Sequence, residues 1–349
     1  MKQSRTAASH ANVHEFVAEV GLSEAAYRRA LEIAQLSPGK DEWLRYINHF
    51  LTAVGSLLIV AGVTAFFAWN WADLGYMTKF ALIQAGIVGT VVLAWRLGID
   101  SVGGRSSLFA GAFLVGVLLA VFGQVYQTGA DPYGLFLGWA LLILPWAIIG
   151  RQAGLWMLFQ TLLNLAFIMY WTQVLHPPTG WWQLSQLLGP LVWLGSTVMD
   201  SRLASYLFAM NVAALLIWEY ATHRGVSWIQ GRWFPRVLTF GALNTVLLPT
   251  LMIIFAASFG ARAGLSQISP FLYIAATATC LYFYQYRKPD LFILTLCLFG
   301  GIMVITSLAV RFMFEDIGSV LILAILLMGQ VAGAAYWLRN VAGRWEADS

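Results

Sequence analysis

Between residues 50 and 338 the chain is a succession of apolar segments, each close to the length of a membrane-spanning helix. A helix of about 20 apolar residues crosses the hydrocarbon core of a bilayer. Only 10% of the residues are charged and 60% are hydrophobic, whereas a soluble domain carries about 25% charged residues. We therefore predict an all-α polytopic transmembrane helix bundle. Its eleven candidate spans are 50–69, 79–97, 107–127, 133–149, 154–171, 184–198, 203–221, 237–259, 270–286, 291–310 and 318–338.

Basic residues distinguish ten spans from eleven, because cytoplasmic loops carry an excess of Lys and Arg. The basic N-terminal tail predicts a cytoplasmic N-terminus. With eleven spans, a group of later basic residues would lie on the non-cytoplasmic side. If one candidate span between Arg151 and Arg224 does not cross the membrane, all of them lie on the cytoplasmic side. This group is Arg224, Arg232, Arg236, Arg287, Lys288, Arg339 and Arg344. The weakest span is 184–198, which is short and contains Gly189-Pro190. We prefer ten spans with both termini in the cytoplasm, and eleven is the alternative.

The predicted organisation is a cytoplasmic helical region at 1–49, the transmembrane bundle at 50–338 and a short polar tail at 339–349. Ser23 is the expected N-cap of a helix in the first region, because a serine oxygen accepts the amide hydrogens that a helix start leaves unpaired. This region either anchors the first span or docks a cytoplasmic partner.

A polar run at residues 122–133 interrupts the apolar sequence at the end of the third candidate span. Gln124, Gln127 and Asp131 are spaced i, i+3 and i+7, which places them on one face of a helix. Tyr126 lies between them. A bilayer offers no water to an amide, so Gln124 needs either a neighbouring helix or a wet cavity. Asp131 precedes Pro132 and fits the N-cap of the next helix equally well.

A second polar turn, around Asn70 and Asp73, follows the first candidate span and lies on the same, non-cytoplasmic side by topology. The two turns predict a polar pocket on the periplasmic side. Its candidate binding residues are Asn70, Asp73, Gln124, Tyr126, Gln127 and Asp131. The alternative is that the first turn is only an interfacial loop anchored by tryptophans.

Other polar residues inside the spans predict contacts between helices. Gln160 and Asn164 share one face of a span, and Asn211 shares a face with Glu219 eight residues later. Amides in such positions usually bond a neighbouring helix. Glu219 is the acid placed deepest in the membrane and the candidate ionisable group, although His223 or Arg224 nearby could pair with it.

The motifs that would support catalysis, metal binding or nucleotide binding are missing from the sequence. It contains no HExxH, CxxC, GxxxxGK[ST] or GxSxG pattern, and its five histidines show no ligand spacing. Cys280 and Cys297 lie in apolar segments and are interpreted as small hydrophobic residues. The net charge of +4 forms no basic stripe. We expect no enzyme activity, no cofactor, no metal and no nucleic-acid partner.

Three stretches resemble the bacterial "domain of unknown function 2157" family of predicted membrane proteins over about residues 13–171. They are GLSEAAYRRAL at 21–31, FFAWNWAD at 66–73 followed by KFAL at 79–82, and FGQVYQTGADPY at 122–133 followed by LFLGW at 135–139. The third is the most specific, because its order of polar residues is unusual for a membrane protein. The resemblance implies a multi-pass protein of the bacterial inner membrane and implies no reaction.

Two functional hypotheses follow. The first is a non-catalytic subunit or interaction protein of a membrane complex, bound to another polytopic membrane protein or to a second copy of itself. The second is a carrier or channel for a small solute or lipid, which would use the periplasm-side polar pocket. In both, the lipid bilayer is the surrounding partner. Two small-residue pairs, Gly134 with Gly138 and Gly329 with Gly333, would suit close helix contact in the first hypothesis.

Overall fold

The computed structural model describes isolated positions between 23 and 71, and then residues 73–126, 131–175, 201–256, 268–313 and 317–348. The chain divides into two compact units, Met1–Gly75 and Tyr76–Ser349. In the first unit, the Ser23 carbonyl accepts the Tyr27 amide at 2.9 Å and the Ser23 hydroxyl accepts the Ala26 amide at 3.4 Å. These bonds agree with the prediction that Ser23 caps a helix.

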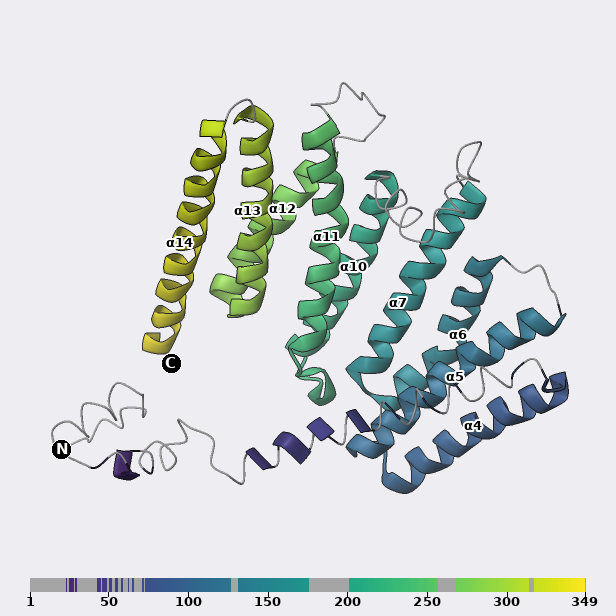
Figure 1. The fold of residues 1–349 in the computed structure, drawn as a ribbon. Helices are drawn as coiled ribbons and strands as arrows, with labels where there is room; N and C mark the ends of the chain where they lie inside the picture. The colour runs from purple at the N-terminus through teal and green to yellow at the C-terminus, as the bar shows by residue number, and fades with distance from the viewer. Residues whose placement is uncertain are drawn as a thin grey trace. The chain divides into compact units, whose positions relative to one another are not determined.

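The second unit is built from helices, and its described residues contain no strand (Figure 1). In chain order the elements are α4 (Tyr76–Leu97), α5 (Val102–Tyr126), α6 (Pro132–Gly150), α7 (Ala153–Tyr170) with the π-helical turn η1 (Trp171–Leu175), α10 (Ser201–His223), the 3-10 turn η2 (Ser227–Ile229), α11 (Trp233–Ala256), α12 (Ile268–Tyr282) with the π-helical turn η3 (Phe283–Arg287), α13 (Leu291–Met313) and α14 (Ile317–Asp348). The predicted all-α helix bundle is confirmed.

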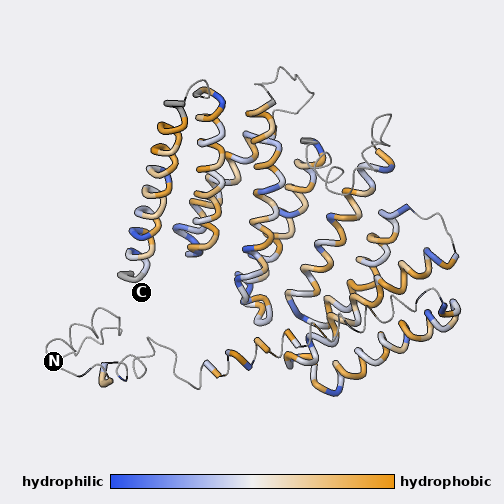
Figure 2. Tube along the Cα trace, in the orientation of Figure 1, coloured by the Kyte–Doolittle hydropathy of each residue, from blue (hydrophilic) through white to orange (hydrophobic). Residues whose placement is uncertain are grey.

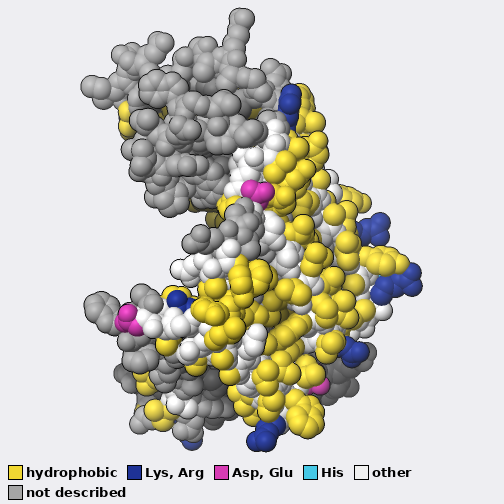
Figure 3. All heavy atoms as spheres, turned by 90° about the vertical axis from the view of Figure 1, so that its right-hand side faces the viewer, with side chains coloured by type: hydrophobic (Ala, Val, Ile, Leu, Met, Phe, Trp, Pro, Cys, Tyr) yellow, Lys and Arg dark blue, Asp and Glu magenta, His cyan; other side chains and the backbone are white. Residues whose placement is uncertain are grey.

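Eight of the described helices are long and apolar enough to cross a membrane: α4, α5, α6, α7 with η1, α10, α11, α13 and α14. Apolar residues run along most of each helix, and hydrophilic residues gather near several helix ends (Figure 2). The space-filling view shows a broad hydrophobic surface on one face (Figure 3). Such exposure suits helices whose solvent is lipid. The predicted span 184–198 lies outside the described residues, and only isolated positions of 50–69 are described.

Helices α7 and α10 are antiparallel neighbours. Ala153 and Trp156, in the first turns of α7, pack against Trp218, near the end of α10. At the opposite end of α7, the Trp171 ring contacts the Tyr206 ring in a tilted arrangement, with ring centroids 5.5 Å apart. The end of η1 and the start of α10 therefore lie on the same side of the bundle. The stretch that connects them, with the predicted span 184–198, lies outside the described residues, so the choice between ten and eleven spans stays a prediction.

Helix α12 has 15 residues and is shorter than the eight helices, and it runs back along α11. Ile254, at the end of α11, packs against Tyr273, near the start of α12. Leu243, in the middle of α11, packs against Tyr284 in η3. With η3, α12 thus leads from the far end of α11 back to the end where α11 begins. The segment 270–286, which was predicted as a span, therefore runs antiparallel to α11.

One end of the second unit gathers basic residues, and we call it the basic end. It is defined by Arg105, Arg151, Arg232, Arg236 and Lys288. The Gln152 amide donates to the Arg105 carbonyl at 3.2 Å, which links the start of α5 to the start of α7. The start of α7 packs against the end of α10. Ion pairs then connect α10 to α11 and to the start of α13. Three of the seven basic residues that the topology prediction grouped on one side, Arg232, Arg236 and Lys288, are therefore found together.

Helices α5, α6 and α7 share a core around Trp139. The Trp139 indole donates to the Ala112 carbonyl at 2.8 Å, which satisfies its polar atom inside the core. The ring lies directly over Gly116, where an added Cβ would approach it to 2.3 Å. A glycine at this position is what allows α5 and α6 to pack closely.

Helix α14 is longer than its predicted span. It continues to Asp348, so nearly all of the predicted polar tail at 339–349 is helical. Near its end, the Trp345 indole donates to the Gln285 carbonyl in η3 at 3.2 Å. This bond ties the end of α14 to the basic end.

Candidate functional site

The residues of the predicted polar pocket fall in different parts of the structure. Gln124 and Tyr126 lie in the last turn of α5 and are both exposed. The Tyr126 ring stacks on Phe80 of α4 with centroids 6.2 Å apart. Gln127 and Asn70 lie outside the described residues.

Asp131 occupies the N-cap position of α6, with Pro132 in the first turn, as the capping alternative predicted. Its carbonyl accepts the Gly134 amide at 2.9 Å, but its side chain makes no capping hydrogen bond and is exposed. Residues 127–130, which connect α5 to Asp131, lie outside the described residues, so the shared face of Gln124 and Asp131 stays a prediction.

Asp73 is exposed and belongs to the first unit, whereas Gln124, Tyr126 and Asp131 belong to the second. Whether these side chains line one pocket stays a prediction.

Glu219, the candidate ionisable group, lies in a cluster of charged residues at the basic end. Its side chain is only 10% exposed. It accepts hydrogen bonds from Arg232 at 3.2 Å, from the Tyr284 hydroxyl at 3.1 Å and from Lys288. Arg224, one of the partners suggested by the sequence, bonds the Tyr220 hydroxyl instead.

Asp290 is the second acid of this cluster, and its side chain is 1% exposed. It accepts two bonds from Arg232, at 2.9 and 3.1 Å, and two from the Arg236 Nε, at 3.1 and 3.2 Å. It also accepts the backbone amides of Phe292 at 3.1 Å and Ile293 at 3.4 Å, and so caps α13. Every lone-pair direction of this carboxylate thus has a donor, which is what a buried charge requires.

We call Glu219, Arg232, Arg236, Lys288 and Asp290 the charge cluster. It joins the end of α10, the start of α11, η3 and the start of α13. Three cations face two carboxylates, which leaves one excess positive charge. The two carboxylates are buried while the cations reach solvent, so each carboxylate depends on its cations for stabilisation.

Sequence reasoning missed four of these five residues as members of a site. Arg232, Arg236 and Lys288 were interpreted only as topology signals, and Asp290 was not singled out. A usable signal was present: Arg232 and Arg236 are spaced i, i+4 on one helix face, and Asp290 directly precedes an apolar run. An acid at that position needs a cation from elsewhere in the chain.

A second polar group, the amide cluster, joins α7 to α10. It consists of Gln160, Asn164 and Asn211, and all three were predicted to bond between helices. The Gln160 and Asn164 amides each donate to the Asn211 side-chain oxygen at 3.2 Å. Asn211 donates back to the Asn164 oxygen at 2.9 Å. The prediction of interhelical amide bonds is confirmed for these residues.

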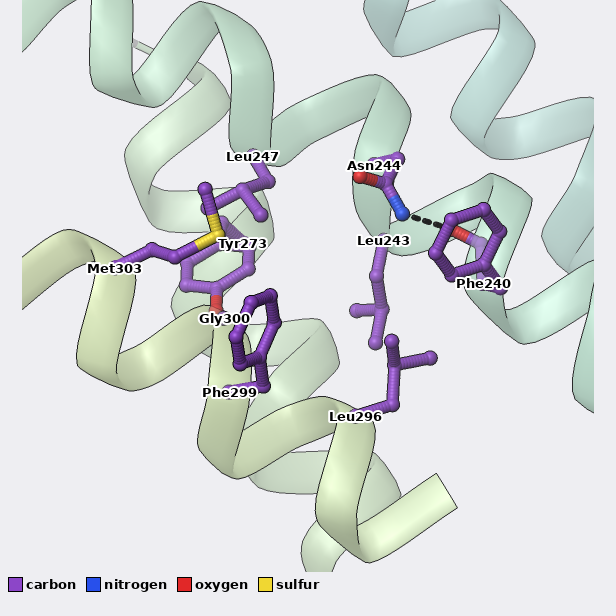
Figure 4. Close-up of a pocket in the computed structure, with 9 residues that line it drawn as sticks. All are labelled: Phe240, Leu243, Asn244, Leu247, Tyr273, Leu296, Phe299, Gly300 and Met303. Carbon is purple, nitrogen blue, oxygen red and sulfur yellow. Dashed lines mark hydrogen bonds between the residues drawn. The ribbon is translucent and has the colours of Figure 1, made fainter. Parts of the chain in front are cut away.

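A small pocket of about 50 Å³ lies between α11, α12 and α13 (Figure 4). Most of its lining is apolar, and its polar members are Asn244 and Tyr273. The Asn244 amide nitrogen donates to the Phe240 carbonyl at 2.7 Å. The Tyr273 hydroxyl is buried without a hydrogen-bond partner and lies where an added Cβ on Gly300 would approach it to 2.4 Å. The lining residues are Phe240, Leu243, Asn244, Leu247, Tyr273, Leu296, Phe299, Gly300 and Met303.

The acidic, histidine and cysteine side chains of the described ranges form no group of three that could hold a metal ion. Cys297 is buried in the core formed by α11, α13 and α14, and Cys280 packs against that core.

Comparison with known families agrees with the resemblance seen in the sequence. Residues 14–156 match the family described as "Predicted membrane protein (DUF2157)". This match covers the part of the chain from the N-terminal region to the start of α7. No curated protein and no solved structure matches the chain. The DUF2157 match and the apolar helices together identify a multi-pass membrane protein.

Proposed function

We propose that this protein is a non-catalytic subunit of a membrane complex in the bacterial inner membrane, and that α14 binds a helix of a polytopic partner. The observation that carries the proposal is the exposure of α14. No residue in its most apolar 18-residue window is buried. This helix contacts its own chain along one stripe, which contains Leu326, Gln330, Ala334 and Val341.

Another side of α14 presents small residues. Gly329 and Gly333 are both exposed, and no atom lies within 4 Å of a Cβ added at either. Exposed Ile325 and Tyr336 lie on the same side, one turn before and after this pair. Small residues at such a position allow two helix backbones to approach closely within a membrane. The α14 face is therefore the surface we assign to the partner.

The polar groups between the described helices support a structural role. The amide cluster bonds α7 to α10, and the charge cluster bonds α10 to α11 and α13. In both, the side chains that a carrier would use to bind a solute are engaged with one another. This use of polar groups is typical of helices that hold a fixed arrangement.

The orientation that we propose places the basic end and the N-terminus in the cytoplasm. The structure gathers Arg105, Arg151, Arg232 and Lys288 at one end, and the positive-inside rule assigns such an end to the cytoplasmic side.

The test is affinity purification of the tagged full chain at native expression level, followed by mass spectrometry of the co-isolated proteins. We expect a stoichiometric polytopic membrane protein with the wild type. Gly329→Leu with Gly333→Leu should remove it, because the added side chains separate the two helices. Gly343→Leu is the matched control, since Gly343 is also exposed on α14 with open space at its Cβ.

Two results would refute the proposal. One is a wild-type protein that is isolated without any stoichiometric membrane partner. The other is a partner retained equally by the double leucine variant and by Gly343→Leu, which would place the interface elsewhere.

A further inference from the structure

Side chains of α11 and α13 face one another from Arg236 and Phe292, which are in contact at the charge cluster, to the pocket of Figure 4, and we call this strip the groove. On α11, Arg236, Phe240 and Asn244 follow one another at intervals of four residues, which places them on one side of the helix. The matching side of α13 presents Phe292 and then Phe299. Both helices begin at the basic end, so the groove runs from that end toward the middle of the bundle.

The two ends of this groove differ in chemistry. At the basic end, the Arg236 guanidinium lies over the Phe292 ring, 5.6 Å from its centroid. Deeper in, the sides are exposed phenylalanines: Phe240 is 51% exposed and Phe299 is 61% exposed. Eight residues of helix separate Arg236 from Asn244, which corresponds to about 12 Å along the axis. A charged opening with an apolar continuation of that length matches a lipid headgroup and the first part of its acyl chain.

Arg236 has donors to offer to a headgroup. Its Nε bonds Asp290, and no hydrogen bond from its two Nη groups to another described residue is found. Its side chain is 40% exposed, more than that of Arg232 or Lys288. The charge cluster also carries one excess positive charge. A guanidinium fork of this kind suits the paired oxygens of a phosphate.

We propose that this groove binds one anionic phospholipid, with its phosphate at Arg236 and one acyl chain between Phe240 and Phe299. The small volume of the pocket, about 50 Å³, suits the first part of a single acyl chain rather than a helix. The positive-inside rule places the basic end at the cytoplasmic leaflet, where anionic lipids are attracted to basic residues near the membrane surface. This inference does not depend on the partner proposed for α14.

The test is native mass spectrometry of the full chain in a neutral detergent, titrated with dioleoyl phosphatidylglycerol or with dioleoyl phosphatidylcholine. The two lipids share their acyl chains and differ in net charge. We expect one phosphatidylglycerol to bind about tenfold more tightly than phosphatidylcholine, a ratio typical of one charge-assisted contact. Arg236→Gln should bring the two affinities together, and Arg236→Lys should keep part of the preference. Arg344→Gln, an exposed arginine of α14, should leave the preference unchanged.

The acyl part of the groove has its own pair of variants. Phe299→Ala should weaken phosphatidylglycerol binding by about fivefold, as expected from losing part of the apolar contact of one aromatic side chain. Phe271→Ala is the matched control, because Phe271 is 71% exposed on α12 and does not line the pocket. This pair keeps the proposal testable if Arg236→Gln fails to fold.

Equal binding of the two lipids by the wild type would overturn the proposal, as would an unchanged phosphatidylglycerol preference in Arg236→Gln. A loss that is the same for Phe299→Ala and Phe271→Ala would show that the acyl chain lies elsewhere. Displacement of the bound phosphatidylglycerol by a co-purified membrane protein would instead assign the groove to a partner helix and overturn the lipid assignment.

Discussion

Replacing Asp290 with alanine tests whether the charge cluster stabilises the fold. The carboxylate is 1% exposed and accepts hydrogen bonds from Arg232, from Arg236 and from two backbone amides of α13. Its removal leaves two guanidinium groups facing each other without their shared counter-charge. It also removes the cap of α13. Both effects act against the folded state.

The expected loss follows from these two contributions. Removing one partner of a buried ion pair costs about 3–5 kcal/mol, and losing an N-cap costs about 1 kcal/mol. The arginines are not fully buried, since Arg232 is 25% and Arg236 is 40% exposed. Solvent screens part of their repulsion, so the lower part of the range applies. The lower limit for the ion pair, about 3 kcal/mol, and about 1 kcal/mol for the cap add to an expected loss of about 4 kcal/mol in the free energy of unfolding for Asp290→Ala.

The assay is unfolding by sodium dodecyl sulfate in mixed micelles, followed by tryptophan fluorescence. Asp290→Asn separates the two contributions, because its amide oxygen can still cap α13 but carries no charge. It should lose most of the stability that Asp290→Ala loses. The control is Asp100→Ala, whose carboxylate is fully exposed and lies 3.9 Å from Arg105. We expect no measurable change for this surface pair.

The reasoning is refuted if Asp290→Ala and Asp100→Ala unfold at the same detergent fraction. It is also refuted if Asp290→Asn matches the wild type while Asp290→Ala is destabilised. That pattern would show that the cap alone matters and that the ion pairs contribute nothing.

Two further predictions use the same unfolding measurement. Gly116→Ala should destabilise the protein by about 2 kcal/mol, the middle of the range for overpacking, because the new methyl group would lie 2.3 Å from the Trp139 ring. Gly138→Ala should not destabilise it, because there is open space at the Gly138 Cβ position. Equal effects of the two substitutions would contradict the packing described for α5 and α6. Asn211→Leu should cost about 1 kcal/mol, because it removes the three side-chain hydrogen bonds that join α7 to α10. Asn244→Leu loses only a bond within its own helix. A smaller loss for Asn211→Leu than for Asn244→Leu would refute the proposed role of the amide cluster.

The sequence was sufficient to predict the helices, because their signal is local. Apolar runs of the length of a span predicted the segments from α4 to α14, and the spacing of Gln160 and Asn164 correctly indicated bonding to another helix. The distribution of basic residues favoured ten spans.

The charge cluster could not be predicted in the same way, because its partners are distant in the chain. Arg232 and Asp290 are 58 residues apart, and Glu219 and Lys288 are 69 residues apart. Helical periodicity relates residues within a few turns and carries no information at that separation. Sequence reasoning therefore looked for a partner of Glu219 among its neighbours, where Arg224 is engaged with Tyr220 instead.

The same basic residues account for three properties of the basic end. Arginine and lysine at the ends of spans determine which side of the membrane those ends occupy. Once there, Arg232 and Lys288 pair with Asp290 and Glu219 and hold three helices in register. A cluster built only for stability would do best with equal numbers of acids and bases, because any unpaired buried charge is costly. Here the additional cation, Arg236, is also the most exposed of the three. Its position at the start of the groove is what links the predicted topology of this protein to the anionic lipid that we propose as its ligand.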